Sequence, residues 1–151
     1  RATAAIVGAR LGVPQSFHPE LMERDSGAWE GLDLDEIRTR HAQAWQDREA
    51  DPYFHRPPGG ENHADLEVRV GALLDALREE LGRPGAEPVG VVTHGVMSRV
   101  ILKCLLDLSP AEAMRVRHPN ALFYRIEFPD PASRHGYFLD GAGPVAGLLR
   151  H

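Results

Sequence analysis

The sequence predicts an α/β domain with three layers, in which helices pack on both faces of a sheet. Residues 88–93 are a run of β-forming residues without polar alternation, typical of a central strand covered on both faces. Segments with helical periodicity surround this strand in the chain, at residues 2–11, 62–81 and 96–107. A length of 151 residues fits one domain, and the sequence contains no internal repeat.

The N-terminal third is predicted to contain two helices. Residues 2–11 carry apolar side chains near one face, and residues 15–19 are predicted to form a short strand. Asp33 suits the N-cap of a second helix, and Glu36 completes a capping box. The helical spacing of apolar residues then continues to Trp45.

The remaining elements follow from turn and cap signals. Residues 51–60 are rich in proline and glycine and predict a loop before the long helix. Residues 109–112 combine a capping serine, a proline and a glutamate, which predicts another helix start. Two late strands are expected at residues 121–128 and 136–139, joined by a turn at residues 129–133.

Composition narrows the range of partners. The net charge of −5 indicates neither a nucleic-acid nor an anionic-membrane partner, so an anionic substrate would need a locally positive pocket. No segment has the pattern of a membrane span or a signal peptide. The single cysteine, Cys104, excludes an internal disulfide and lies in an apolar stretch. We therefore expect a buried thiol and a cytoplasmic protein.

The end of the central strand is a candidate anion site. Residues 88–93 lead directly to His94 and Gly95, where the next helix begins. Unpaired backbone N–H groups and the helix dipole attract anions at such a point, and a histidine can add a proton or a charge. The alternative, a histidine that only makes a hydrogen bond at the strand end, stays open.

Two loops carry further candidates. Glu23 lies beside Arg24 in a glycine-containing loop that Trp29 would anchor, so it could donate a proton to a leaving group. From the local sequence alone, a solvated surface acid is the favoured interpretation of Glu23. Gly59 and Gly60 could bring backbone N–H groups close to a ligand, or could simply connect the loop to the long helix.

No cofactor or metal is expected from the motifs. The histidines other than His94 lack the two- or four-residue spacing of metal ligands, although a zinc site built from distant ligands stays open. The sequence has no phosphate-binding P-loop, no dinucleotide fingerprint and no serine nucleophile elbow.

Taken together, these segments resemble the histidine phosphatase superfamily, the phosphoglycerate mutase-like proteins. The resemblance covers essentially the whole chain in the family's order. The matching motifs are Arg1-Ala2-Thr3-Ala4-Ala5, Leu21-Met22-Glu23-Arg24 with Gly27 and Trp29-Glu30-Gly31, Pro58-Gly59-Gly60-Glu61, Val91-Val92-Thr93-His94-Gly95, and Pro119-Asn120. Each motif is modest alone, but their order and combination are specific.

The resemblance implies a phosphomonoester hydrolase in which a histidine first takes the phosphoryl group and water then releases phosphate. It implies that Arg1 clamps phosphate oxygens and that Glu23 protonates the leaving oxygen and later helps to activate water. His94, with the N–H of Gly95, would stabilise the transferring group. It further implies a metal-independent reaction on a small phosphorylated metabolite.

Two more motif residues have peripheral roles by the same resemblance. Arg24 and Glu61 would shape the substrate side of the site. The resemblance also implies a mostly parallel central sheet, whose first strand should end in an Arg-His-Gly motif that contains the nucleophile. No such motif precedes Arg1, so residues 1–151 are interpreted as an N-terminally truncated domain that lacks the strand beside residues 88–93. We expect this chain to be inactive alone and poorly stable unless that strand is supplied.

The tripeptide Arg134-His135-Gly136 matches the expected Arg-His-Gly motif in sequence but not in position along the chain. It follows a Pro-Asp-Pro turn near the C-terminus, so we expect a chance match in a hairpin loop.

Two other functions stay open. The short span from Glu23 to Glu61 favours a phosphatase over a phosphomutase of the same family. A non-catalytic binding domain is also possible, but the presence of Arg1, Glu23 and His94 argues for an enzyme. Residues 53–56 could meet a substrate or pack the loop, and we favour packing.

Overall fold

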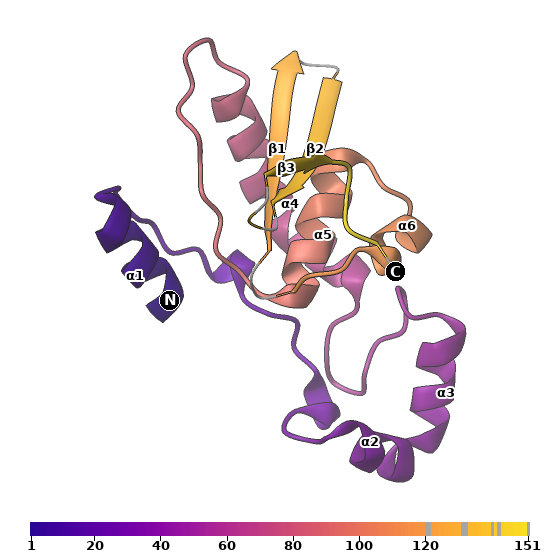
Figure 1. The fold of residues 1–151 in the computed structure, drawn as a ribbon. Helices are drawn as coiled ribbons and strands as arrows, with labels where there is room; N and C mark the ends of the chain where they lie inside the picture. Colours follow the sequence, from indigo (N-terminus) through magenta and orange to yellow (C-terminus); the bar gives the residue numbers. More distant parts are fainter. Residues whose placement is uncertain (120–121, 131–132, 140, 142, 151) are drawn as a thin grey trace.

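The computed structural model describes residues 1–119, 122–130, 133–139, 141 and 143–150. Figure 1 shows a helical body with a small sheet beside it. The helices are α1 (Ala2–Leu11), α2 (Leu34–Arg40), α3 (Ala42–Ala50), α4 (His63–Leu81), α5 (Gly95–Leu106) and α6 (Pro110–Arg115), with 3-10 helices η1 (Pro19–Leu21) and η2 (Gly27–Trp29). The strands are β1 (Phe123–Asp130), β2 (Ser133–Leu139) and β3 (Pro144–Ala146).

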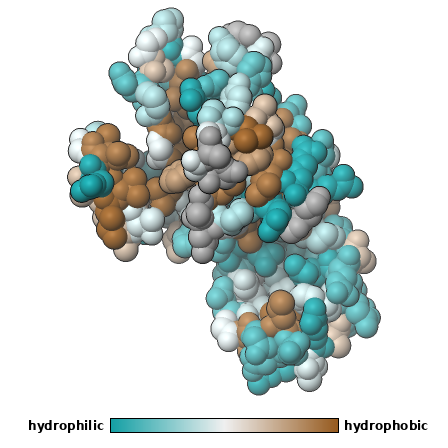
Figure 2. All heavy atoms as spheres, in the orientation of Figure 1, coloured by the Kyte–Doolittle hydropathy of each residue, from teal (hydrophilic) through white to brown (hydrophobic). Residues whose placement is uncertain are grey.

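Helix α1 is set apart from the helical body in Figure 1. It ends as predicted at Gly12, which adopts the left-handed conformation with φ of 67°. Its side chains Ile6 and Leu11 are 70% and 67% exposed. The apolar surface at this position is visible in Figure 2. The amphipathic pattern of this helix therefore faces solvent in this structure.

The second predicted helix is divided in two. Asp33 caps α2 and forms the predicted capping box with Glu36. The backbone then breaks at His41, with φ of −129° and ψ of 41°, and α3 begins at Ala42. Residues 15–19, predicted as a strand, contain no strand, and η1 begins at the end of this segment.

The core lies between α4 and α5. Leu66, Val70 and Leu74 of α4 pack against a facing set on α5 that includes Met97 and Val100. Asn62 caps α4 in a capping box with Asp65, which fixes the start of the long helix where the sequence predicted it. This helix pair is the platform on which the candidate site is built.

The described sheet is antiparallel, so the expectation of a mostly parallel central sheet is not met in this part of the chain. Its strand order is β1-β2-β3, and both pairings are antiparallel. The predicted late strands are present, but Pro129 and Asp130 extend β1, and Ser133 already begins β2. The short β3 was not predicted. Residues 120, 121, 131 and 132, which figured in the predicted motif, strand and turn, lie outside the described residues.

Residues 88–93 do not form the predicted strand. Within the described residues, ladder hydrogen bonds join only β1, β2 and β3, so this segment has no ladder partner. Val89, Val91 and Val92 are each more than 40% exposed. Residues 88–93 therefore form an irregular segment whose valine side chains are exposed to solvent, because no neighbouring strand pairs with them.

The prediction that Arg134-His135-Gly136 lies in a hairpin loop was wrong. All three residues belong to β2, and His135 is paired with Glu127 of β1. They line an open hollow of about 430 Å³ together with Tyr137, Ala146 and Gly147. Among the described helices, none is long and apolar enough to cross a membrane.

Candidate active site

Glu23 lies at the N-terminus of α5, next to His94. Its carboxylate accepts hydrogen bonds from the backbone N–H groups of Val96 (3.2 Å) and Met97 (3.1 Å), and from that of Arg24 (3.0 Å). A negative charge is favoured at this end of a helix, where N–H groups have no intrahelical partner. The acid loop and the predicted anion site therefore meet at one point.

His94 is the N-cap of α5, and its side chain is exposed. Gly95, the first residue of the helix, is also exposed, and a Cβ built on it would meet no atom within 4 Å. Just before them, the hydroxyl of Thr93 donates a 2.6 Å hydrogen bond to the carbonyl of Leu21, which ties the end of residues 88–93 to the acid loop. His94 and Gly95 thus line an open, solvent-facing side of the site.

Arg69 of α4 holds the acid loop in place. Its guanidinium donates to the carbonyl oxygens of Glu20 (3.0 Å), Met22 (3.1 Å) and Glu23 (3.3 Å). It also pairs with Glu61 through two hydrogen bonds of 2.9 and 3.0 Å. A planar guanidinium suits this task because its donors form a fixed fork. Sequence reasoning missed Arg69, since nothing in its helical context distinguishes it from a surface cation.

The glycine-rich loop packs against the acid loop, backbone to backbone. The N–H of Ala28 donates to the carbonyl of Pro58, and the N–H of Glu61 to that of Asp25. A Cβ on Gly27 would lie 2.3 Å from the carbonyl oxygen of Pro58, and Gly27 has φ of 54°. These glycines therefore allow the glycine-rich loop and the acid loop to approach each other closely. The carboxylate of Glu61 is engaged with Arg69 and the N–H of Asp25.

Arg24 and Arg99 lie near Glu23, and Arg48 lies near both of these arginines. Burial lowers the pKa of Arg24, and the charge of Arg48 lowers it further while Glu23 raises it. Burial likewise lowers the pKa of Arg99, which Glu23 raises and Arg48 lowers. These side chains come from the acid loop, from α3 and from α5, so the fold gathers a cluster of positive charge in a chain with a net charge of −5.

Two histidines lie in the same positive region. Burial lowers the pKa of His63 to about 4, and the charges of Arg24 and Arg99 lower it further. The pKa of His118 is lowered to about 4 by burial and by Arg99. Both side chains are therefore neutral near pH 7. Sequence reasoning had searched the histidines only for metal spacing, which these do not show.

A polar network under the loop fixes His63. The ring of His63 stacks on that of Tyr53 with centroids 4.8 Å apart. The Tyr53 hydroxyl donates a 2.6 Å hydrogen bond to Glu67, which also accepts one of 2.8 Å from Lys103. Burial raises the pKa of Glu67, but the bonds from Lys103 and Tyr53 lower it overall.

Other side chains of the proline-rich loop, residues 51–60, also pack against neighbouring parts of the chain. His55 stacks on Trp29, which is only 5% exposed and anchors the acid loop as predicted. Arg56 pairs with Asp65 at 2.5 Å. Phe54 lies at the surface beside an apolar pocket.

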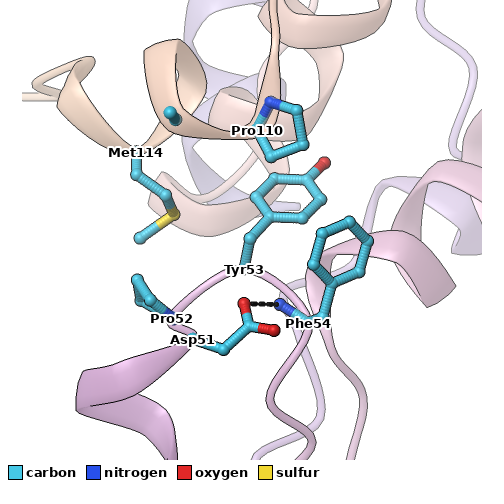
Figure 3. A pocket seen from close by; sticks show the side chains of 7 residues that line it. Asp51, Pro52, Tyr53, Phe54, Pro110 and Met114 are labelled. Atoms are coloured by element: carbon cyan, nitrogen blue, oxygen red, sulfur yellow. Dashed lines mark hydrogen bonds between the residues drawn. The ribbon is translucent and has the colours of Figure 1, made fainter.

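Figure 3 shows this pocket between the loop after α3 and the start of α6. It measures about 260 Å³ and is lined by Asp51, Pro52, Tyr53, Phe54, Pro110, Ala111 and Met114. The only charged group, the carboxylate of Asp51, accepts from the N–H of Phe54 at 3.1 Å. Its chemistry does not suit a phosphorylated ligand.

Arg1 lies away from this cluster. Its guanidinium sits 5.5 Å from the ring centroid of Phe17, and none of its described contacts is with Glu23 or His94. The structure therefore brings together Glu23, Arg24, His94, Gly95 and Glu61, but not Arg1. Within the described ranges, no group of three or more His, Cys, Asp or Glu side chains could hold a metal ion.

Comparison with known proteins identifies the family to which the chain belongs. The model of the histidine phosphatase superfamily (branch 1) matches residues 1–135. A 6-phosphofructo-2-kinase/fructose-2,6-bisphosphatase of Gallus gallus is 32% identical over 109 residues, covering 72% of this chain and 22% of that protein. The chain thus spans about a fifth of that relative's length. A probable phosphoglycerate mutase, GpmB of Yersinia enterocolitica, is 28% identical over 97% of this chain and 67% of its own length.

Solved structures show the same fold. A mycobacterial glucosyl-3-phosphoglycerate phosphatase superposes with a TM-score of 0.73 at 24% identity, covering 99% of this chain and 71% of that one. The α-ribazole phosphatase of Shigella flexneri gives a TM-score of 0.67 at 17% identity, covering 99% and 67%. The family match over most of the sequence shows that the chain belongs to the histidine phosphatase superfamily.

Proposed function

We propose that residues 1–151 carry the acid–base and anion-stabilising part of a phosphomonoester hydrolase that reacts through a phosphohistidine. The observation that carries this proposal is the position of Glu23 at the N-terminus of α5, beside His94 and among half-buried arginines. A proton donor, fixed N–H donors and guanidinium groups at one point are what phosphoryl transfer requires.

In the first step, a histidine nitrogen attacks phosphorus and the bond from phosphorus to the substrate oxygen breaks. Glu23 gives its proton to the departing oxygen, which leaves as an alcohol. His94 and the N–H of Gly95 stabilise the negative charge on the phosphoryl oxygens, and Arg1 binds those oxygens once it reaches them. Arg24 and Glu61 shape the substrate side.

In the second step, water attacks the phosphohistidine and Glu23 accepts its proton. The bond between nitrogen and phosphorus breaks, inorganic phosphate leaves and the histidine is regenerated. No step requires a metal ion, because guanidinium groups and backbone N–H groups offset the phosphoryl charge.

We propose that the nucleophilic histidine lies in an Arg-His-Gly segment outside residues 1–151. Such a segment would form a strand along residues 88–93, whose valines are exposed and which have no ladder partner among the described residues. Residues 1–151 alone are then inactive. The substrate is a small phosphorylated metabolite, and the single cysteine favours a cytoplasmic enzyme.

The test is a kinetic comparison in a form of the protein that includes such a segment. Glu23→Gln should slow hydrolysis of ethyl phosphate by about 100-fold or more, and that of p-nitrophenyl phosphate much less, because an aryl leaving group needs less protonation. Glu30→Gln, a change at an exposed acid in the same loop, is the matched control. Equal losses on both substrates would remove Glu23 from the acid role. Phosphohistidine-dependent turnover by residues 1–151 alone would refute the external nucleophile.

A further inference from the structure

The apolar pocket in Figure 3 takes no part in the proposed function, since neither Glu23 nor His94 lines it. One wall is the loop after α3, and its central side chain is Tyr53, which is only 3% exposed. The Tyr53 ring stacks on His63 with centroids 4.8 Å apart, and its hydroxyl donates a 2.6 Å hydrogen bond to Glu67. This wall is therefore held in place from outside the pocket.

The opposite wall is the start of α6, which is fixed by its own contacts. Ser109 caps this helix in a capping box with Glu112, and Pro110 fills its first position. Ala113 of the same helix is fully buried. Because each wall is held independently of the other, the hollow between them is preformed, as most small-molecule sites are.

The size and the lining of the pocket suit one aromatic ring. A cavity of about 150 Å³ with apolar walls can hold one benzene molecule. The volume of about 260 Å³ in this pocket therefore accommodates a ring with a short chain attached. Phe54, at the rim, is 52% exposed, and the sulfur of Met114 is suited to contact with an aromatic ring. An apolar ligand would remove this surface from water, which is favourable.

Asp51 gives the pocket a negative charge without a counterion. This residue is the C-cap of α3, where the helix dipole already contributes a negative potential. Its carboxylate accepts one hydrogen bond, of 3.1 Å from the N–H of Phe54, and forms no ion pair within the described part of the chain. Among the described residues, no lysine, arginine or histidine lines the pocket. The charge that complements this rim is positive, and the exposed ring of Phe54 also attracts a cation.

We propose that this pocket binds a small arylalkylammonium ion. The aromatic ring lies between residues 52–54 and α6, and the ammonium group lies at the carboxylate of Asp51. Apolar walls with a single placed charge are typical of sites that orient a small ligand. This inference goes beyond the proposed function and does not depend on it, because the two sites share no lining residue.

The test is NMR titration of residues 1–151 with 2-phenylethylammonium. The comparison probes are 2-phenylethanol and 3-phenylpropanoate, which carry the same ring with a neutral or a negative end. We expect the ammonium probe to bind with a Kd on the order of 1 mM. It should bind about fivefold more tightly than the alcohol and at least about tenfold more tightly than the carboxylate, because Asp51 is exposed and its charge is partly screened. The amide signals of Phe54 and Ala111 should shift, since both residues line the pocket.

Three variants separate the charge from the apolar walls. Asp51→Asn should abolish the preference for the ammonium probe and leave the affinity for the alcohol within about twofold, because the amide oxygen can still accept from Phe54. Asp47→Asn, an exposed acid one turn earlier on α3 and outside the pocket, is the matched control and should change nothing. Ala111→Leu, at an exposed position, fills the pocket and should weaken both the ammonium probe and the alcohol at least about tenfold. An unchanged urea midpoint of this variant shows that it is folded.

Each of the other outcomes overturns the proposal. Equal affinities of the three probes would show that Asp51 does not select a cation. Shifts that leave out Phe54 and Ala111 would place the ligand elsewhere, as would a folded Ala111→Leu variant that binds normally. Absence of binding at 10 times the expected Kd, which is about 10 mM, would refute the site itself.

Discussion

Replacing Arg69 by alanine tests whether α4 holds the acid loop. The variant loses two bonds to Glu61 and those to the carbonyls of Glu20, Met22 and Glu23. The side chains of Arg69 and Glu61 are 23% and 26% exposed, so the pair is mostly but not fully shielded from solvent. Breaking a buried pair costs about 3–5 kcal/mol, and this partial exposure places the expected loss of unfolding free energy at about 3 kcal/mol.

Urea unfolding followed by tryptophan fluorescence measures this loss, because Trp29 is buried in the acid loop. A loss of about 3 kcal/mol should lower the midpoint by about 1.5–2 M urea for a domain of this size. Arg69→Lys should recover part of the loss, since a lysine keeps the charge but not the fork. The control is Arg38→Ala, whose pair with Asp35 has side chains 51% and 92% exposed and should contribute less than about 0.5 kcal/mol. If Arg69→Ala is no more destabilising than Arg38→Ala, Arg69 does not anchor the loop.

Other perturbations test the same geometry. Gly27→Ala should cost at least about 2 kcal/mol in urea unfolding, because it combines positive φ with a 2.3 Å approach to Pro58. Gly12→Ala has a similar φ but open space around it, so it should cost only about 1 kcal/mol, and equal losses would refute the steric argument. Because the pKa of His63 is lowered from 6.5 to about 4 in the folded protein, the folded state binds fewer protons than the unfolded state between pH 4 and pH 6.5. His63 should therefore account for a fall in stability of about 2 kcal/mol between pH 7 and pH 5, and His63→Phe should lose that much less stability than the unmodified chain over this range. Glu23→Gln should bind inorganic phosphate several-fold more tightly in calorimetry, since it removes a negative charge from the anion site; unchanged affinity would place phosphate elsewhere.

The predictions that succeeded rest on local signals. The capping boxes predicted at Asp33 and Ser109 begin helices there, because each cap and its partner are three residues apart. The long helix begins at the predicted place, residue 62, where the apolar stripe starts. The start of α5 next to His94 was also predicted correctly, because the hydrophobic pattern changes there from that of a strand to that of a helix. The strand predicted at residues 88–93 failed because a strand forms only when it pairs with a neighbouring strand. The described sheet contains β1, β2 and β3, and none of these pairs with residues 88–93.

The part of the site that sequence reasoning missed is built by long-range contacts. Arg69 reaches carbonyls almost fifty positions away in the chain, and Arg48, His63 and Arg99 come from three different helices. Nothing local marks such residues, since arginines on helices usually face solvent. Only the folded arrangement shows that Arg69 binds the acid loop and that Arg99 lies close to Glu23.

The position of Glu23 couples the stability of the site to its chemistry. As a carboxylate, Glu23 provides the negative charge that the first N–H groups of α5 attract. As an acid under the proposed function, it must carry a proton while the leaving group departs. A phosphoryl group that enters beside His94 brings its own negative charge to the same helix end, so the N–H groups keep an anionic partner when Glu23 is protonated. The positive charges of Arg24 and Arg99 therefore face an anion in both states under the proposed function, so the acid loop does not need to move between them.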